Sequence, residues 1–224
     1  MSRTDAVRIW SSLDTDGPPR VAWARAASSS RIAVLLGAFD PPTNAHLDLL
    51  SAAARVDGSA PVLCMTKVLL ARPSDELLAR EERVDVLSRI AERVDTGLAF
   101  ANRGTYLDVG RLLSADGIDA TFVVGADKIA QLADPSFYGD GVDGVRATFG
   151  ELRFIVVGRG DVDPRPVPAS ARARLLDPSD VFRDAVTAAV SGTDVRRRVR
   201  SGAPVSDLVP PEVAVALRGY TSAR

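Results

Sequence analysis

One threonine and the chain's single histidine stand where a turn rich in glycine and proline passes into a predicted helix. The turn is Gly37-Ala38-Phe39-Asp40-Pro41-Pro42, and Thr43 and His46 follow it. Gly37 lets the backbone come close to a ligand, and Thr43 is a suitable N-cap residue. Residues three apart project from one side of a helix, whose first N–H groups attract phosphate. The pair predicts a phosphate site. The alternative is that Thr43 only caps the helix and that His46 lies at its start without binding a ligand.

A second phosphate-binding candidate lies near the end of the chain, in Ser191-Gly192-Thr193-Asp194-Val195-Arg196. Ser191 or Thr193 can cap a helix, and Arg196 lies on the same side as Thr193. An arginine in a first helical turn meets the unfavourable end of the helix dipole, and a bound anion would offset that cost. The later arginines of the run fit a solvated helix face. Only Arg196 has the spacing to share a phosphate with Thr193.

The elements that must position these motifs are short apolar runs that alternate with helical patterns. The runs lie at 32–36, 61–65, 98–100, 120–124 and 154–157. Apolar runs without polar alternation are typical of strands buried on both faces, as in a parallel sheet. Helical spacing is found at 44–56, 75–95, 106–116 and 127–133. The alternation predicts an α/β fold with a doubly wound, mostly parallel, Rossmann-like sheet of five or six strands and helices on both faces.

Ligands of doubly wound folds bind beyond the carboxyl ends of the strands, so we expect both motifs there. Residues 31–224 are predicted to form this domain. Residues 1–30 are predicted to be an N-terminal extension, with a short helix over 1–12 and a linker broken at Asp16-Gly17-Pro18-Pro19.

Composition excludes several classes of protein. The 224 residues are 46% apolar, which argues against global disorder, and the net charge of −1 gives no overall attraction to nucleic acid or membrane. A lone Cys64, in an apolar run, excludes an internal disulfide framework and is expected in the core rather than as a nucleophile. One histidine rules out metal sites that need two, and no metal site is predicted.

Without an apolar stretch of about 18–20 residues or a secretory leader, a cytoplasmic location is expected.

The ordered motifs resemble those of the nucleotidylyltransferase superfamily. The segment from Gly37 to His46 is similar to G-x-F-D-P…(H/T)-x-G-H, and the segment from Ser191 to Arg196 is similar to I-S-S-T-x-x-R. Further segments resemble those of bacterial nicotinate or nicotinamide mononucleotide adenylyltransferases: Arg83, Thr105-Tyr106-Leu107-Asp108, Val124-Gly125-Ala126-Asp127 and Leu208-Val209-Pro210-Pro211-Glu212-Val213. The resemblance covers roughly residues 32–220.

The resemblance implies transfer of an adenylyl group from ATP to the phosphate of nicotinate or nicotinamide mononucleotide, with release of pyrophosphate. The acceptor phosphate would attack the α-phosphorus directly, so catalysis would consist of positioning and charge stabilisation. His46 would donate to an α-phosphate oxygen, while Thr43 and Thr193 would orient phosphates. Arg196 and Lys67 would neutralise the leaving pyrophosphate. Mg²⁺ would arrive with ATP rather than in a protein cage.

The resemblance also implies two sets of binding residues. The nucleotide would contact Gly37, Ala38, Phe39, Ala45, Gly125, Asp127, Gly158, Arg159, Ser191, Gly192 and Thr193. The acceptor would contact Asp40, Arg83, Thr105, Tyr106, Asp108, Phe137 and Tyr138. A purely structural role stays open for many of them, and for Asp40 it is favoured. Residues 134–150 are expected to be a mobile loop over the site or a plain surface insertion.

Several departures from the family pattern leave the acceptor open. Thr43 replaces the first histidine, as in phosphopantetheine adenylyltransferases, Ala45 replaces a glycine, and Gly192 replaces a serine. The usual P-H-K stretch is reduced to Lys67, and Phe137 or Tyr138 would have to replace a stacking tryptophan. The alternatives are a phosphopantetheine adenylyltransferase, a cytidylyltransferase, or a nucleotide-binding protein that has lost turnover. The expected partners are ATP and a small phosphorylated acceptor, with no nucleic acid or membrane; a homo-oligomer stays open.

Overall fold

The five predicted apolar runs form the central strands of one sheet. The structure, a computed structural model, describes residues 3–68, 76–158, 168 and 171–221. The strands are β1 (Val21–Arg25), β2 (Arg31–Gly37), β3 (Ala60–Thr66), β4 (Gly97–Ala101), β5 (Asp119–Gly125), β6 (Arg153–Val157) and β7 (Arg172–Leu176). Their order is β1-β4-β3-β2-β5-β6-β7, and only β1 is antiparallel to its neighbour among these strands. The predicted fold class is confirmed, with seven strands instead of five or six.

The central strands are buried on both faces, which explains their unbroken apolar sequences. In β2, Ala33 and Leu35 pack into one core cluster, whereas Ile32, Val34 and Leu36 pack into the other. Successive side chains of a strand point to opposite faces, so both sets must be apolar when helices cover both sides.

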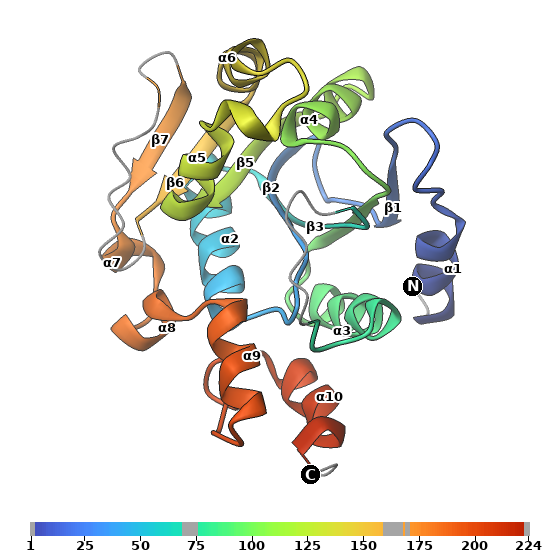
Figure 1. Ribbon diagram of the computed structural model, residues 1–224, viewed down its shortest axis with the longest axis vertical. Helices are drawn as coiled ribbons and strands as arrows, with labels where there is room; N and C mark the ends of the chain where they lie inside the picture. The colour runs from blue at the N-terminus through green and yellow to red at the C-terminus, as the bar shows by residue number, and fades with distance from the viewer. Residues whose placement is uncertain (1–2, 69–75, 159–167, 169–170, 222–224) are drawn as a thin grey trace.

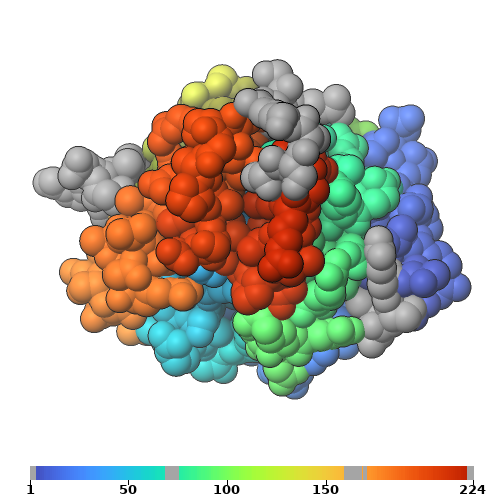
Figure 2. Space-filling view, turned by 90° about the horizontal axis from the view of Figure 1, so that it is seen from below, coloured from blue at the N-terminus to red at the C-terminus, as the bar shows by residue number. Residues whose placement is uncertain are grey.

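Two groups of helices cover the two faces (Figure 1). The first core cluster includes residues of α1 (Arg3–Ser12), α2 (Asn44–Asp57), α3 (Arg80–Arg93), α9 (Gly192–Arg200) and α10 (Pro211–Thr221). The second includes residues of α4 (Tyr106–Ala115), α5 (Ala126–Leu132) and α6 (Val142–Glu151). The shorter elements are α7 (Pro178–Val181), α8 (Ala185–Ala189) and the 3₁₀-helix η1 (Pro135–Phe137). Figure 2, seen from below, shows α9 and α10 side by side over the end of the molecule.

The strand order opens a crevice beside β2. From β2 the chain continues to β3 and β4 on one side, and it then returns to place β5 and β6 on the other side. Where the chain leaves two neighbouring parallel strands in opposite directions, the two connections separate. The separation opens a crevice at the carboxyl ends of those strands. The turns that follow β2 and β5 therefore face a shared opening.

The N-terminal segment contains the predicted short helix, as α1, and an edge strand that the sequence analysis missed. β1 pairs with β4, and Trp10 of α1 lies buried with its ring 5.4 Å from that of Phe100, edge to face. β7 was missed as well. Both strands lie at the edges of the sheet and are only partly buried, so they lack the unbroken apolar runs of the central strands.

The prediction of a mobile loop over 134–150 is wrong. This segment forms η1 and α6, and Phe149 is buried against the ring of Phe154 in the second core cluster. Glycines at 141, 144 and 150 concealed the helix in the sequence. Gly144 is required by packing, because a β-carbon there would lie 2.7 Å from the Tyr138 side chain.

Candidate active site

A cavity of about 370 Å³ opens at the crevice between the turns after β2 and β5. It is lined by residues from elements that are far apart in the sequence: the β2–α2 turn, α4, α5 and the start of α9. Of the residues predicted to act in catalysis or to bind nucleotide or acceptor, the following line it: Gly37, Ala38, Phe39, Asp40, Ala45, His46, Thr105, Tyr106, Gly125, Asp127, Ser191, Gly192, Thr193 and Arg196.

Thr43 fixes the ring of His46 at the start of α2. The Thr43 backbone N–H donates to His46 Nδ1 at 3.0 Å, and Thr43 Oγ1 lies 2.8 Å from the same nitrogen. A nitrogen that accepts a backbone N–H carries no proton, so the proton of the neutral ring is on Nε2. The ring lines the cavity, and the ring of Phe39 meets it edge to face at 5.5 Å. The arrangement makes His46 a hydrogen-bond donor of fixed orientation, with Thr43 buried behind it.

The start of α9 supplies a second set of donors. Ser191 is its N-cap, and the Arg196 guanidinium donates from Nη2 to Thr193 Oγ1 at 2.9 Å. Nη1 of the same group donates to the Asp40 carbonyl oxygen at 2.6 Å, which joins α9 to the β2–α2 turn. A β-carbon on Gly192 would lie 3.2 Å from that carbonyl oxygen. Gly192 therefore permits the close approach of α9 to the β2–α2 turn. The prediction that Thr193 and Arg196 lie on the same side of the helix is confirmed.

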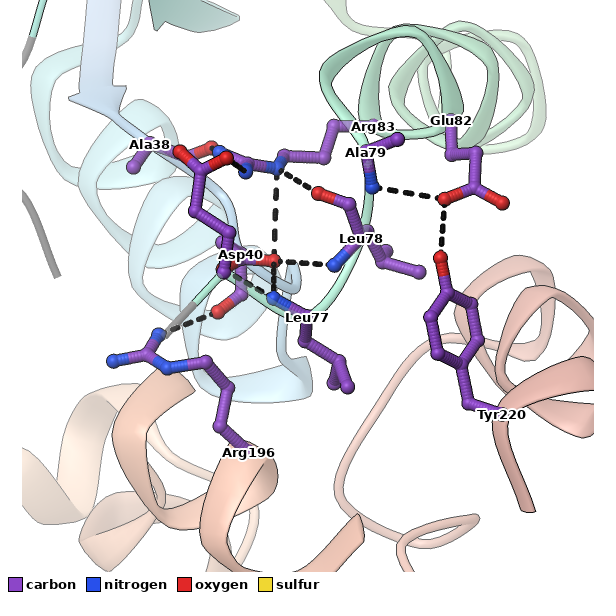
Figure 3. Close-up of polar contacts among 10 residues, drawn as sticks. Ala38, Asp40, Leu77, Leu78, Ala79, Glu82, Arg83, Arg196 and Tyr220 are labelled. Carbon is purple, nitrogen blue, oxygen red and sulfur yellow. Dashed lines mark hydrogen bonds and ion pairs between the residues drawn. The ribbon is translucent and has the colours of Figure 1, made fainter. Parts of the chain in front are cut away.

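Asp40 serves the structure through its carboxylate (Figure 3). The carboxylate accepts the backbone N–H groups of Leu77 and Leu78, each at 2.9 Å, and Arg83 Nε lies 3.5 Å from it. Arg83 also pairs with Glu76 at 3.1 Å, and both Asp40 and Arg83 are buried. Arg83 does not line the cavity, and the Asp40 carboxylate is committed to these partners. Both side chains hold the chain before α3 against the β2–α2 turn, which is the structural role favoured for Asp40.

The opposite wall of the cavity comes from α4 and α5. The Tyr106 hydroxyl donates to the Leu36 carbonyl oxygen at 3.1 Å, and burial raises the pKa of this hydroxyl above its usual range, so it stays protonated. The Asp127 side chain is exposed in the cavity wall. A β-carbon on Gly125 would lie 2.5 Å from Asp127 Oδ1, so only glycine lets that carboxylate fold back over the turn.

Other predicted site residues lie elsewhere. The Lys67 ammonium donates to the Leu13 carbonyl oxygen at 2.6 Å and lies 5.0 Å from the Trp10 ring centre, so it fastens the N-terminal segment instead of facing the cavity.

Further predicted residues also lie outside the cavity wall. Asp108 caps α4 and lines a neighbouring hollow. Phe137, Tyr138 and Gly158 do not line the cavity; Tyr138 donates to the Leu132 carbonyl oxygen, and Gly158 packs on Pro178. Arg159 lies outside the described residues.

The cavity lining includes residues that sequence reasoning did not predict as site residues. Among those with polar or aromatic side chains are Lys128 and Gln131 of α5, and Phe182 after α7. A signal for Lys128 was present, because it is one of only two lysines in the chain and it directly follows Asp127 at a strand-to-helix turn. Phe182 follows no strand and stands in no motif.

Within the ranges that the structure describes, no three His, Cys, Asp or Glu side chains are grouped so that they could hold a metal ion. Those ranges also contain no helix with the length and apolar content needed to cross a bilayer.

A family model described as cytidylyltransferase-like matches residues 34–198. The chain belongs to the cytidylyltransferase-like family. Two solved structures of nicotinic acid mononucleotide adenylyltransferase from Plasmodium falciparum resemble it in fold. The one complexed with NaAD has a TM-score of 0.62 at 15% identity, and the one complexed with APC has 0.63 at 13%. Each match covers 86% of this chain and 94% of the other.

The matched region of this cytidylyltransferase-like chain runs from β2 into α9. It therefore contains both helix starts that meet at the cavity, His46 at one and Arg196 at the other. The predicted membership of the nucleotidylyltransferase superfamily is confirmed by the family model. At 13–15% identity, the solved structures establish the fold of this family member. They do not identify its substrate.

Proposed function

We propose that this protein transfers an adenylyl group from ATP to the phosphate of nicotinate or nicotinamide mononucleotide and releases pyrophosphate. The observation that carries the proposal is the convergence of His46, at the start of α2, and Arg196, in the first turns of α9, on one cavity. Two helix starts and two donor side chains around one opening suit a chain of phosphates.

In this proposal His46 acts at the reacting phosphorus. An oxygen of the acceptor phosphate attacks the α-phosphorus of ATP, and the bond to the bridging oxygen of pyrophosphate breaks. Negative charge builds on the α-phosphate oxygens as the bonds exchange. The His46 donor, held by Thr43, stabilises this charge without reorganising. The attacking phosphate is already anionic, so no general base is required.

Arg196 and Thr193 act on the leaving side. The Arg196 guanidinium is held at two points, by the Asp40 carbonyl oxygen and by Thr193 Oγ1. A guanidinium held in this way can bind phosphate with little loss of side-chain freedom. It would neutralise the charge that collects on pyrophosphate as it departs.

Mg²⁺ belongs to the substrate in this proposal, because it enters as Mg-ATP. Of the two aspartates in the cavity wall, Asp40 has its carboxylate engaged with backbone N–H groups, whereas Asp127 is exposed there. Asp127 suits a water molecule of the metal's shell, or the nucleotide ribose, since magnesium retains several waters. The bound ion would screen the charge of the triphosphate.

The test is to follow pyrophosphate released from Mg-ATP with separate acceptors: nicotinate mononucleotide, nicotinamide mononucleotide and phosphopantetheine. Mg-CTP with each acceptor serves as the matched nucleotide control. We expect release with ATP and a pyridine mononucleotide, and none after chelation of magnesium. Release with phosphopantetheine alone, or with CTP alone, would replace this proposal by the corresponding transferase. ATP binding without release from any acceptor would instead show a binding protein without turnover.

A further inference from the structure

Lys128 is a cation in the cavity wall that the proposed chemistry leaves unused. Its ammonium donates to the side-chain oxygen of Gln131, one turn further along α5, and both residues line the cavity. Among the described residues it forms no ion pair. Burial lowers the pKa of the ammonium, and the nearby Asp127 carboxylate opposes that shift. A partly buried cation whose hydrogen-bond partner is a neutral amide is stabilised by an anion that arrives with a ligand.

Lys128 lies in a different wall of the cavity from His46 and Arg196. His46 and Arg196 stand on α2 and α9, which pack in the first core cluster, whereas Lys128 stands on α5, which packs in the second with α4. A mononucleotide whose phosphate lies at the starts of α2 and α9 directs its base away from them. On the other side of the cavity, Lys128 and Gln131 share the wall with Thr105 and Tyr106.

We propose that Lys128, oriented by Gln131, is a specificity-determining residue that selects an acceptor bearing a carboxylate on its base over one bearing a neutral amide. The inference rests on the proposed function and narrows it to nicotinate mononucleotide. A carboxylate accepts a charge-assisted hydrogen bond from the ammonium, whereas an amide leaves the cation without a counter-charge. The Gln131 oxygen remains a partner for a second ammonium proton, so the carboxylate adds a bond without removing one.

The experiment measures kcat/KM for nicotinate and nicotinamide mononucleotide with the full-length protein and with Lys128→Met. We expect the wild type to favour the acid and Lys128→Met to reduce the acid-to-amide ratio by about 10- to 100-fold, the value of a hydrogen bond to a charged group. The loss of kcat/KM should occur with nicotinate mononucleotide. Activity with nicotinamide mononucleotide reports that the variant is folded. Lys128→Glu should lower the ratio further by repelling the carboxylate. The control is Arg111→Met, which removes an exposed cation of α4 that pairs with Glu151, and its ratio should match the wild type.

The measured ratios distinguish failure of the proposed function from failure of the role proposed for Lys128. Turnover of neither acceptor by the wild type overturns the proposed function and this inference with it. Turnover with a ratio that Lys128→Met leaves unchanged overturns the inference alone. An equal loss with both acceptors has the same effect, since it would place the ammonium on a phosphate or on ATP. A wild type that uses the amide as well as the acid also refutes the proposed selection.

Discussion

His46 has two roles in the structure, and substitutions at this position can separate them. Its Nδ1 accepts the Thr43 backbone N–H and so caps α2, while the far side of the ring supplies the proposed donor to the α-phosphate. The substitution His46→Ala removes both the capping acceptor and the proposed donor. Asparagine carries an acceptor oxygen at the same distance along the side chain as Nδ1, and it places no donor where Nε2 lies.

The expected magnitudes differ for the two variants. Loss of a donor to developing charge costs about 2.7–4 kcal/mol of transition-state stabilisation, or about 10²- to 10³-fold in kcat, and applies to both His46→Asn and His46→Ala. Loss of the capping acceptor beside the buried Thr43 costs about 1–2 kcal/mol of unfolding free energy and applies to His46→Ala alone. We therefore expect equal defects in turnover and unequal stabilities.

Pyrophosphate release under saturating substrates gives kcat, and urea unfolding gives the free energy of unfolding. If His46→Asn turned over within a few-fold of wild type, His46 would be a cap and not a catalytic residue. If both variants were as stable as wild type, the bond from the Thr43 N–H would not hold the ring.

Three further predictions concern residues around the site. Arg196→Lys should lower kcat/KM by roughly 10- to 100-fold, because one ammonium cannot reach both the Asp40 carbonyl and Thr193 while also binding phosphate. Trp10→Ala should lower the unfolding free energy by about 3–5 kcal/mol in urea titrations, because the ring is buried against Phe100. Cys64 should resist iodoacetamide at about pH 8.5 and react once urea unfolds the chain, because burial raises the pKa of its thiol to about 12.

Each of these has an outcome that would contradict it. Wild-type kinetics in Arg196→Lys would mean that a single positive charge suffices on the leaving side. A stability loss in Trp10→Ala no larger than that of Val186→Ala, a change at a 60% exposed position, would mean that the N-terminal segment does not pack on the sheet. Rapid alkylation of folded Cys64 would mean that β3 opens readily to solvent.

Several features of this protein were determined by local sequence alone. The central strands were predictable because their apolar runs must be buried on both faces, and α2 and α9 were predictable because Thr43 and Ser191 are good N-cap residues. The edge strands β1 and β7 and the helix α6 were not, since partly buried strands and glycine-containing helices carry weak local patterns. Lys67 was misplaced because a lysine at the end of a strand has the same local sequence whether it faces a ligand or the Leu13 carbonyl.

By itself, the sequence determined the strand-to-helix turns and the residues with the right chemistry at each of them. The tertiary structure decided which of those residues share a cavity. It buried the Asp40 carboxylate and Arg83 against the chain before α3, turned Arg196 toward the Asp40 carbonyl, and placed Lys128 in the wall. The physical reason is distance along the chain: helix propensity and capping act over a few residues, whereas the cavity depends on contacts between segments joined only by the order of strands in the sheet.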